Sequence, residues 1–174
     1  MRQVWRMYKI PNLLASKCFV ARYGGDPLSL GYSGKHLAKS SWAAKSLVRV
    51  VISMKGAIGK RIGNGKDNSI LQDIWVKEKK ISRIAQPLES QSGKVSDLLT
   101  TDRRWNANLI WKSFEEDTAR DILSIYVPTH ECKEEFRWLA KKNGEFTFKS
   151  GYWVAAASAK VSTWRPKQEA FWKL

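Results

Sequence analysis

Apolar positions recur at helical spacing in several short stretches of the chain. The pattern predicts helices over residues 3–9, 13–22, 41–54, 105–114, 116–125 and 151–159. Pro11 disfavours helical geometry at the residue before it, and the Asn12 side chain is expected to cap the second helix. Gly24, Gly25 and Pro27 are expected to end that helix in a loop that runs to about residue 40. The pattern therefore predicts a chain built mainly from short helices.

Two turn signals interrupt the helical pattern. The first, Gly63-Asn64-Gly65, lies between apolar residues at 58–62 and at 70–71. The second, Asn143-Gly144, separates two stretches in which apolar and polar residues alternate. Short turns of this composition join antiparallel strands, because their residues accept positive φ angles. The sequence thus predicts an α+β fold of mainly short helices with two small β-hairpins.

Composition divides the chain into four segments. Residues 77–94 show no periodicity, contain Lys, Ser, Gln, Pro and Gly, and are expected to be a connector. The connector separates residues 1–76, a basic helical segment that ends in the Gly-Asn-Gly hairpin, from residues 95–160. This second region is expected to hold a helix pair, the Asn-Gly hairpin and a helix, and residues 161–174 follow it. The longest uncharged run, 150–159, is too short to span a membrane.

The chain of 174 residues has a formal charge of +15, which is unevenly distributed. Residues 1–66 contain 13 Lys and Arg and one acid, or +12, and residues 67–174 contain 18 basic and 15 acidic residues, or +3. A region of one sign attracts a polyanion by releasing its counterions, so nucleic acid is the expected partner. Two alternatives are a solvated basic surface and an organellar targeting peptide. A hydrophobic fraction of 43% excludes a wholly disordered polyelectrolyte.

Few residues are arranged as catalytic groups or metal ligands. His130 and Cys132 are the only close pair of soft ligands, whereas structural zinc sites use two such pairs. The chain has no Asp-Asp pair for two-metal chemistry and no Gly-x-Ser-x-Gly motif. Gly63-Asn64-Gly65-Lys66 lacks the spacing of a phosphate-binding loop, and a turn explains it better. No catalytic residue, metal ligand or cofactor is predicted.

Nine Trp residues are spread evenly along the chain. Large aromatic side chains fill the interiors of small domains, and they also stack on unpaired bases. Because these Trp residues are not gathered on one strand pair, we expect most of them to lie in the core.

A series of motifs, in order and over nearly the whole chain, resembles one protein family. The motifs are Gln3-Val4-Trp5-Arg6, Ala21-Arg22-Tyr23, Arg61-Ile62-Gly63-Asn64-Gly65, Asp73-Ile74-Trp75, Val95-Ser96-Asp97-Leu98, Trp105-Asn106, Ile122-Leu123-Ser124-Ile125 and the run from Trp138 to Tyr152. They resemble the region downstream of the polymerase domain in plant LINE-type (non-LTR) retrotransposon polyproteins. That region lies between the reverse transcriptase thumb and the reverse transcriptase zinc-binding domain, often followed by ribonuclease H. The block Lys-Asn-Gly-x-Phe-x-x-Lys-Ser-x-Tyr, at 142–152, is the most specific.

The chain departs from the family pattern at three places. Lys60 stands where the family usually has Trp, Leu71 replaces another Trp, and Ala44-Lys45-Ser46 replaces a block that begins with Trp. Lost aromatic residues lead us to expect weaker packing, as in a decayed copy. Met1 falls inside a family motif, and Phe171-Trp172-Lys173-Leu174 resembles the opening of the zinc-binding domain. Residues 161–174 are therefore expected to be its truncated start.

The resemblance implies a non-catalytic fragment of a reverse transcriptase polyprotein. The family's catalytic and metal-binding residues lie outside the matching motifs, so none is assigned here. Nuclear residence and neighbouring polymerase and zinc-binding domains as partners are likewise implied. We expect contacts to the backbone of RNA or DNA, which position nucleic acid without reading its bases. The expected contact residues are Arg2, Arg6, Lys9, Lys17, Arg22, Lys60, Arg61 and Lys66.

Two other classes of function stay open. A protein–protein docking module would pack against polymerase or zinc-binding domains and have no nucleic-acid role of its own. A competent reverse transcriptase or nuclease would have to show Mg²⁺-dependent extension or cleavage with this chain alone, and we expect none.

Overall fold

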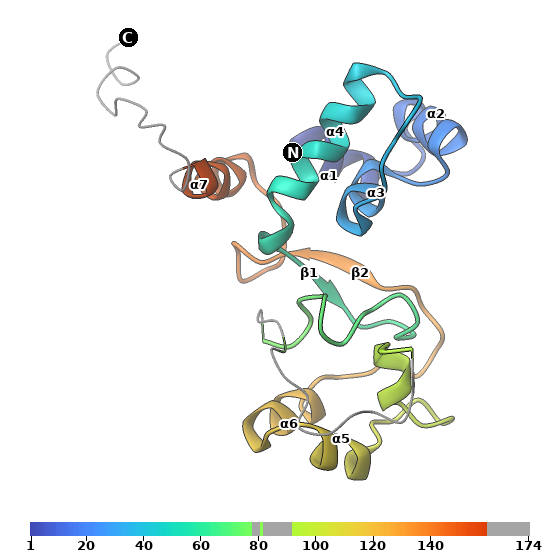
Figure 1. Ribbon diagram of the computed structural model, residues 1–174, viewed down its shortest axis with the longest axis vertical. Coiled ribbons are helices and arrows are strands. Elements are labelled where there is room, and N and C mark those ends of the chain that lie inside the picture. The colour runs from blue at the N-terminus through green and yellow to red at the C-terminus, as the bar shows by residue number, and fades with distance from the viewer. Residues whose placement is uncertain (78–80, 82–91, 160–174) are drawn as a thin grey trace. The chain divides into compact units, whose positions relative to one another are not determined.

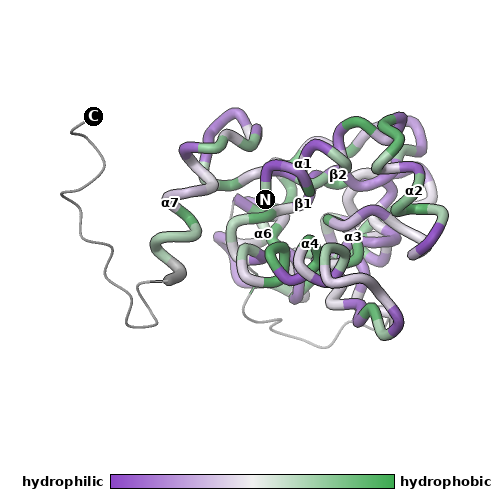
Figure 2. The backbone as a smooth tube through the Cα atoms, turned by 90° about the horizontal axis from the view of Figure 1, so that it is seen from above, coloured by the Kyte–Doolittle hydropathy of each residue, from purple (hydrophilic) through white to green (hydrophobic). Residues whose placement is uncertain are grey.

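The computed structural model describes residues 1–77, 81 and 92–159 (Figure 1). The chain forms two compact units: unit 1 is Met1–Ala57 with Ala140–Leu174, and unit 2 is Ile58–Leu139. Helices and one small antiparallel sheet make up the regular structure of the described residues, so the predicted α+β class with mainly short helices is confirmed. Hydrophilic and hydrophobic positions alternate along the helices (Figure 2).

The helices of unit 1 largely follow the predicted pattern. They are α1 (Arg2–Lys9), α2 (Leu14–Tyr23), α3 (Pro27–Ser33), α4 (Trp42–Ser53) and α7 (Phe148–Ala159), with a short 3-10 turn η1 (Lys55–Ala57) after α4. Helix α3 packs on α4, and α1 contacts α2, α3 and α4. The cluster at the centre of this packing contains Met7, Phe19, Leu30, Ala44 and Val48. The predicted helices at 3–9, 13–22, 41–54 and 151–159 are thus confirmed, within a few residues at their ends.

Helix α3 corrects the prediction of a loop between residues 24 and 40. The Asp26 carboxylate caps it by accepting hydrogen bonds from the N–H groups of Leu28 (2.9 Å) and Ser29 (3.1 Å). Pro27 occupies the first turn, where its missing N–H costs nothing. Gly31 lies against α4 so closely that a Cβ there would be 2.5 Å from the Cβ of Val51. The dipeptide Asp26-Pro27 was therefore a helix start and not only a loop signal.

The start of α2 also differs from the prediction. Leu13, and not Asn12, stands at the N-cap, and no side chain caps the helix. The Ser16 hydroxyl instead donates to the carbonyl oxygens of Met7 (3.2 Å) and Ile10 (3.0 Å). Ser16 thereby ties α2 to the last turn of α1, which explains why a serine is buried there.

The segment before α7 is anchored to α1 by aromatic packing. Trp5 stacks on Phe146, with ring centroids 5.9 Å apart, and Gly151 leaves no room for a Cβ beside the same ring. Thr147 and Ser150 exchange hydrogen bonds between side chain and backbone, so Thr147 caps the start of α7. Residue 148 is consequently helical and not part of a strand.

Unit 2 contains the sheet, and its pairing corrects the prediction of two local hairpins. Strand β1 (Ile58–Arg61) pairs antiparallel with β2 (Glu135–Trp138), and the register runs from Ile58 opposite Trp138 to Arg61 opposite Glu135. Both strands were expected, but each was expected to pair with its sequence neighbour. On the other side of β1, the Lys60 N–H donates to the Ile74 carbonyl oxygen at 2.8 Å, a single contact where the first hairpin was expected.

Close packing of the Gly-Asn-Gly loop explains this choice of partner. A Cβ on Gly63 would lie 2.4 Å from the Cys132 carbonyl oxygen, and a Cβ on Gly65 would lie 2.6 Å from the Ser96 nitrogen. The Gly65 N–H also donates to the Glu134 carboxylate at 2.7 Å. The loop therefore packs against the residues that lead into β2, and β1 is brought beside that strand.

The remaining elements of unit 2 surround its core. They are the 3-10 helix η2 (Val95–Leu98), α5 (Ala107–Ser113) and α6 (Glu116–Leu123). Asn106 caps α5 by accepting the Leu109 N–H, and Trp75 stacks on Trp105 with centroids 6.1 Å apart. The core cluster is Ile62, Ile70, Trp75, Val76, Ile81, Val95, Leu98, Ile110, Phe114, Ala119 and Ile122. The two helices predicted at 105–114 and 116–125 are confirmed.

The predicted division into segments stays a prediction. The connector at 77–94 and the segment at 161–174 lie mostly or wholly outside the described residues. Among the residues that are described, those on both sides of the connector belong to unit 2.

Substitution of Gly63 tests the packing of the loop. Gly63→Ala is expected to lower the free energy of unfolding by about 3 kcal/mol, since its neighbours are backbone atoms that cannot move aside easily. Gly56→Ala is the matched control, because no heavy atom lies within 4 Å of a Cβ there, and it should change stability by less than about 0.5 kcal/mol. Urea unfolding measures both variants, and equal effects would contradict the packing argument.

Candidate nucleic-acid interface

Helix α1 gathers three of the eight predicted basic residues on one face. Arg2, Arg6 and Lys9 follow one another at intervals of four and three residues, which places them on the same side of a helix. The opposite side is held in the core of unit 1 by Val4 and Met7, which are 0% and 7% exposed. Packing of the apolar side therefore sets the direction in which the three exposed cations point.

Helix α2 adds two further cations of the predicted set. Lys17 and Arg22 are both exposed, but a spacing of five residues places them on different sides of the helix. The Arg22 guanidinium lies 5.7 Å from the centre of the Tyr23 ring, close enough for a cation–π contact. Lys17 forms no ion pair with a described residue. The two residues are accessible to a polyanion without forming a single stripe.

The excess charge belongs to unit 1. The sequence segments of unit 1 contain 17 basic and 3 acidic residues, or +14, and those of unit 2 contain 14 basic and 13 acidic residues, or +1. One of the three acids, Asp26, is already bound to the first turn of α3. The difference in net charge between the two parts of the chain is therefore larger between the compact units than between residues 1–66 and 67–174.

The other three predicted residues lie in unit 2, and two of them already have acidic partners. The Lys60 ammonium donates to Asp73 Oδ2 (2.9 Å) and to the Asp67 carbonyl oxygen (2.6 Å). The side chains of Lys60 and Asp73 are only 11% and 7% exposed. Lys66 forms an exposed ion pair with Glu131 at 3.1 Å. Arg61 is exposed and forms no ion pair with a described residue.

The Lys60–Asp73 pair gives Lys60 a structural role. Asp73 Oδ2 also accepts the Ser69 N–H at 2.7 Å, so the carboxylate joins β1 to the chain that follows the Gly-Asn-Gly loop. Lys60 is accommodated in this position as the partner of a buried acid. We therefore leave Lys60 out of the surface that contacts nucleic acid.

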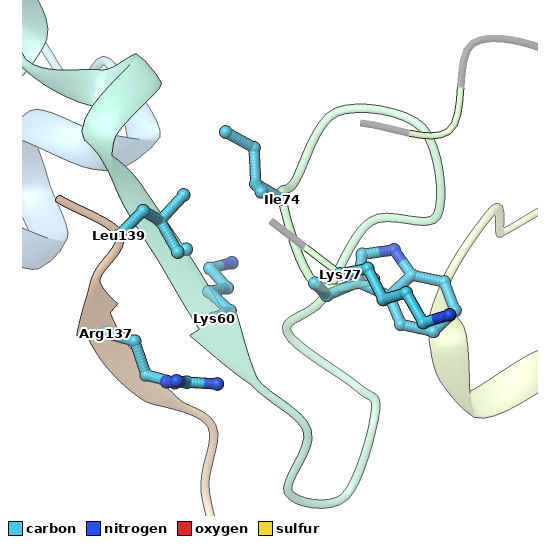
Figure 3. A pocket seen from close by; sticks show the side chains of 7 residues that line it. Lys60, Ile74, Lys77, Arg137 and Leu139 are labelled. Atoms are coloured by element: carbon cyan, nitrogen blue, oxygen red, sulfur yellow. The ribbon is translucent and has the colours of Figure 1, made fainter. Parts of the chain in front are cut away.

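A small pocket of unit 2 is lined by several cations (Figure 3). Its volume is about 150 Å³, below the roughly 300 Å³ at which small-molecule sites begin. Of its basic residues, Lys60 is bound to Asp73 and Lys77 is paired with Asp121. Arg137 comes from β2 and forms no ion pair with a described residue. The pocket is too small, and its charge too far neutralised, to hold a cofactor.

The Gly-Asn-Gly loop does not offer an empty anion site. The Gly65 N–H is taken by the Glu134 carboxylate, and the Lys66 N–H donates to Asn64 Oδ1 at 3.0 Å. A protein carboxylate thus stands where a phosphate would have to bind. The interpretation of this loop as a structural turn is supported over that of a phosphate cradle.

The described residues bring no metal-binding cluster together. No three His, Cys, Asp or Glu side chains within residues 1–77, 81 and 92–159 converge on one point. Cys18 lies in unit 1 and Cys132 in unit 2, and both are free. None of the helices in the described part of the chain is long and apolar enough to cross a membrane.

Sequence reasoning missed an exposed aromatic residue beside two cations on α4. Among the seven described Trp residues, Trp5, Trp75 and Trp138 are buried and Trp105 is half-buried, whereas Trp42, Trp111 and Trp153 are 83%, 45% and 58% exposed, so fewer lie in the core than expected. Lys45 and Arg49 stand three and seven residues after Trp42, and both are exposed. The signal was present in the sequence, because Ala44, Val48 and Val51 already mark the opposite face as apolar.

Comparison of the chain with protein-family models, with curated proteins and with solved structures finds no match. The role of this interface therefore rests on its own residues and charges.

Substitution of Lys60 separates a structural role from a role in binding. Lys60→Met leaves the Asp73 carboxylate buried without its partner and is expected to lower the free energy of unfolding by about 3 kcal/mol. Arg61→Met, next in the chain and exposed, should leave stability unchanged within about 0.5 kcal/mol. Chemical denaturation compares the two variants. A stable Lys60→Met protein would return Lys60 to the set of free surface cations.

The pKa of Glu131 reports whether the Lys66–Glu131 ion pair is formed. The hydrogen bond from Lys66 and its positive charge lower the pKa of Glu131 below the ordinary value. The pair therefore contributes stability above the unfolded-state pKa, and this contribution is lost as the pH falls through the lower, folded-state pKa. In Lys66→Gln, the pKa of Glu131 measured by NMR should rise toward its ordinary value. An unchanged pKa would show that the pair does not persist in solution.

Proposed function

We propose that this chain is a non-catalytic part of a retrotransposon-type reverse transcriptase polyprotein, and that unit 1 binds the backbone of RNA or DNA. The observation that carries the binding proposal is the segregation of charge, +14 in unit 1 against +1 in unit 2. A surface of this sign gains affinity for a polyanion from the release of condensed counterions. The family origin rests on the resemblance of the sequence motifs.

The arrangement of α1 supports backbone contact over base recognition. Its three cations lie on one exposed face, and the buried side holds that face in a fixed direction. Lys and Arg in such an array reach phosphates, which have the same charge at every position of a strand. Binding of this kind positions a template or product strand without selecting its sequence.

The locations of the family-like motifs support a positioning role. Gly63 and Gly65 permit close backbone packing, and the Arg103 guanidinium donates to the Gly63 carbonyl oxygen at 2.9 Å. Trp75 Nε1 donates to the Ile70 carbonyl oxygen, and Trp105 Nε1 donates to that of Ile125. These motif residues are used by the fold of unit 2 itself. Unit 2 is then proposed to have a structural role and not to be a second reactive centre.

A salt titration of nucleic-acid binding tests this proposal. The affinity for a labelled single-stranded or duplex oligonucleotide should fall linearly with the logarithm of salt concentration. Replacing Arg2, Arg6 and Lys9 together by Gln should reduce the magnitude of that slope by about 2 to 3, as each lost phosphate contact contributes about 0.7 to 0.9. Fluorescence anisotropy between 50 and roughly 200 mM salt measures the slope.

A triple variant in unit 2 is the matched control. Arg104, Lys112 and Lys133 are exposed and form no ion pair with a described residue, so replacing them by Gln removes the same charge from the nearly neutral unit. This control should keep most of the wild-type slope. Absence of binding at low salt, a slope near zero, or equal losses in the two triple variants would contradict the proposal.

One observation favours the alternative of a docking module. Phe148, Tyr152 and Trp153 on α7 are 72%, 55% and 58% exposed, which is much aromatic surface for one helix to leave in water. If α7 docks onto a protein domain, Phe148→Ser with Tyr152→Ser should abolish that docking and leave the salt slope unchanged. The alternative would be favoured by two results together: the α7 variant loses docking, and the α1 variant keeps full nucleic-acid binding.

A further inference from the structure

Helix α4 has two faces of opposite character. Ala44, Val48 and Val51 face the interior of unit 1 and are 4%, 5% and 0% exposed. Trp42, Lys45 and Arg49 recur at helical spacing on the other side and are exposed. The Ser41 hydroxyl caps the helix by accepting the Ala44 N–H at 3.3 Å. The first turn, which carries Trp42, is therefore held in place by a cap and by the core.

The Trp42 side chain is exposed and is not used in packing the fold. It is the most exposed large apolar side chain of the described residues, at 83%. Its indole ring makes no hydrogen bond and no ring contact with a described residue. Both faces of the ring are accordingly open to a flat partner.

The neighbours of Trp42 are cations without acidic partners. Neither Lys45 nor Arg49 forms an ion pair with any residue that the structure describes. At a rise of 1.5 Å per residue, they lie about 4.5 and 10.5 Å from Trp42 along the helix axis. An extended chain that carries both planar groups and negative charges can contact all three side chains at once.

We propose that the exposed face of α4 is a binding site for single-stranded nucleic acid, in which a base stacks on Trp42 and flanking phosphates contact Lys45 and Arg49. The inference rests on the proposed function, because it assumes that unit 1 binds a nucleic acid. It goes further by naming the form of the ligand. Bases within a duplex have both faces covered by their neighbours, so only an unpaired strand can offer a base to the indole.

Charge complementarity favours this ligand over a protein partner. The phosphates of a strand follow one another along its backbone, so successive phosphates on one side of the stacked base can reach Lys45 and then Arg49. The surrounding unit has a formal charge of +14, which attracts a polyanion and repels basic surfaces. An acidic peptide remains the competing occupant, and the experiment includes it as a probe.

The test compares Trp42→Leu with Trp111→Leu in the full chain. Trp111 is also exposed, at 45%, but lies on α5 of the nearly neutral unit 2. Trp42→Leu should weaken binding of a single-stranded oligothymidylate by about tenfold, as base–aromatic stacking predicts. Its salt slope and its affinity for a duplex of the same length should not change. Trp111→Leu should leave all three quantities unchanged.

Substitution of Lys45 and Arg49 tests the phosphate contacts of the same site. Lys45→Gln with Arg49→Gln should reduce the magnitude of the salt slope for the single strand by about 1.4, which corresponds to two lost phosphate contacts. Since all three side chains are exposed, the variants should fold, and circular dichroism with thermal unfolding checks this. Trp42→Phe should retain most of the affinity, because a smaller ring still stacks.

Separate outcomes overturn the inference and the proposed function. If the wild-type chain shows no salt-dependent binding to either oligonucleotide, the proposed function fails. If binding is normal but Trp42→Leu has no effect, or weakens duplex binding equally, only the stacking site is overturned. Poly-glutamate is the probe for an acidic protein partner. If it displaces the single strand but not the duplex, and this displacement depends on Trp42, the face belongs to an acidic protein partner and the stacking site is overturned.

Discussion

The pairing of β1 with β2 is the constraint on which the structure of unit 2 depends. The strands lie at the two ends of the unit, at residues 58–61 and 135–138, so the chain between them must close into a loop. Closure is made possible by Gly63 and Gly65, whose missing side chains let the backbone approach residues 96 and 132. The Lys60–Asp73 ion pair then joins β1 to the following segment. The helices, cap residues and stacked Trp rings then fill the interior of the loop that the paired strands close.

Unit 1 uses the opposite strategy, with mostly local contacts. Short amphipathic helices place apolar side chains inward, and Asp26, one of its few acids, is bound to a helix start. Its cations are consequently left on the outside with little internal neutralisation. This arrangement costs some stability through self-repulsion, and a polyanion would relieve that repulsion on binding. The same reasoning explains why the candidate interface lies on helices and not in a pocket.

Some parts of the candidate interface could be predicted from the sequence. The face formed by Arg2, Arg6 and Lys9 follows directly from helical spacing, and so does the buried face opposite it. Lys60 could not be assigned correctly, because its acidic partner is set by the packing around β1. Trp42 was missed for another reason: composition alone places most Trp residues in a core, although the apolar face of the same helix already indicated that this ring lies outside.

The sequence by itself determined the class of the fold, most of its helices and the one-sided charge. Those properties depend on residues close together in the chain, where periodicity, caps and composition act directly. Only the tertiary structure decided which strands pair and which cations remain without partners. Strand pairing joins residues more than seventy positions apart, and no local pattern specifies a partner at that distance. Packing of the Gly-Asn-Gly loop determines which strand pairs with β1.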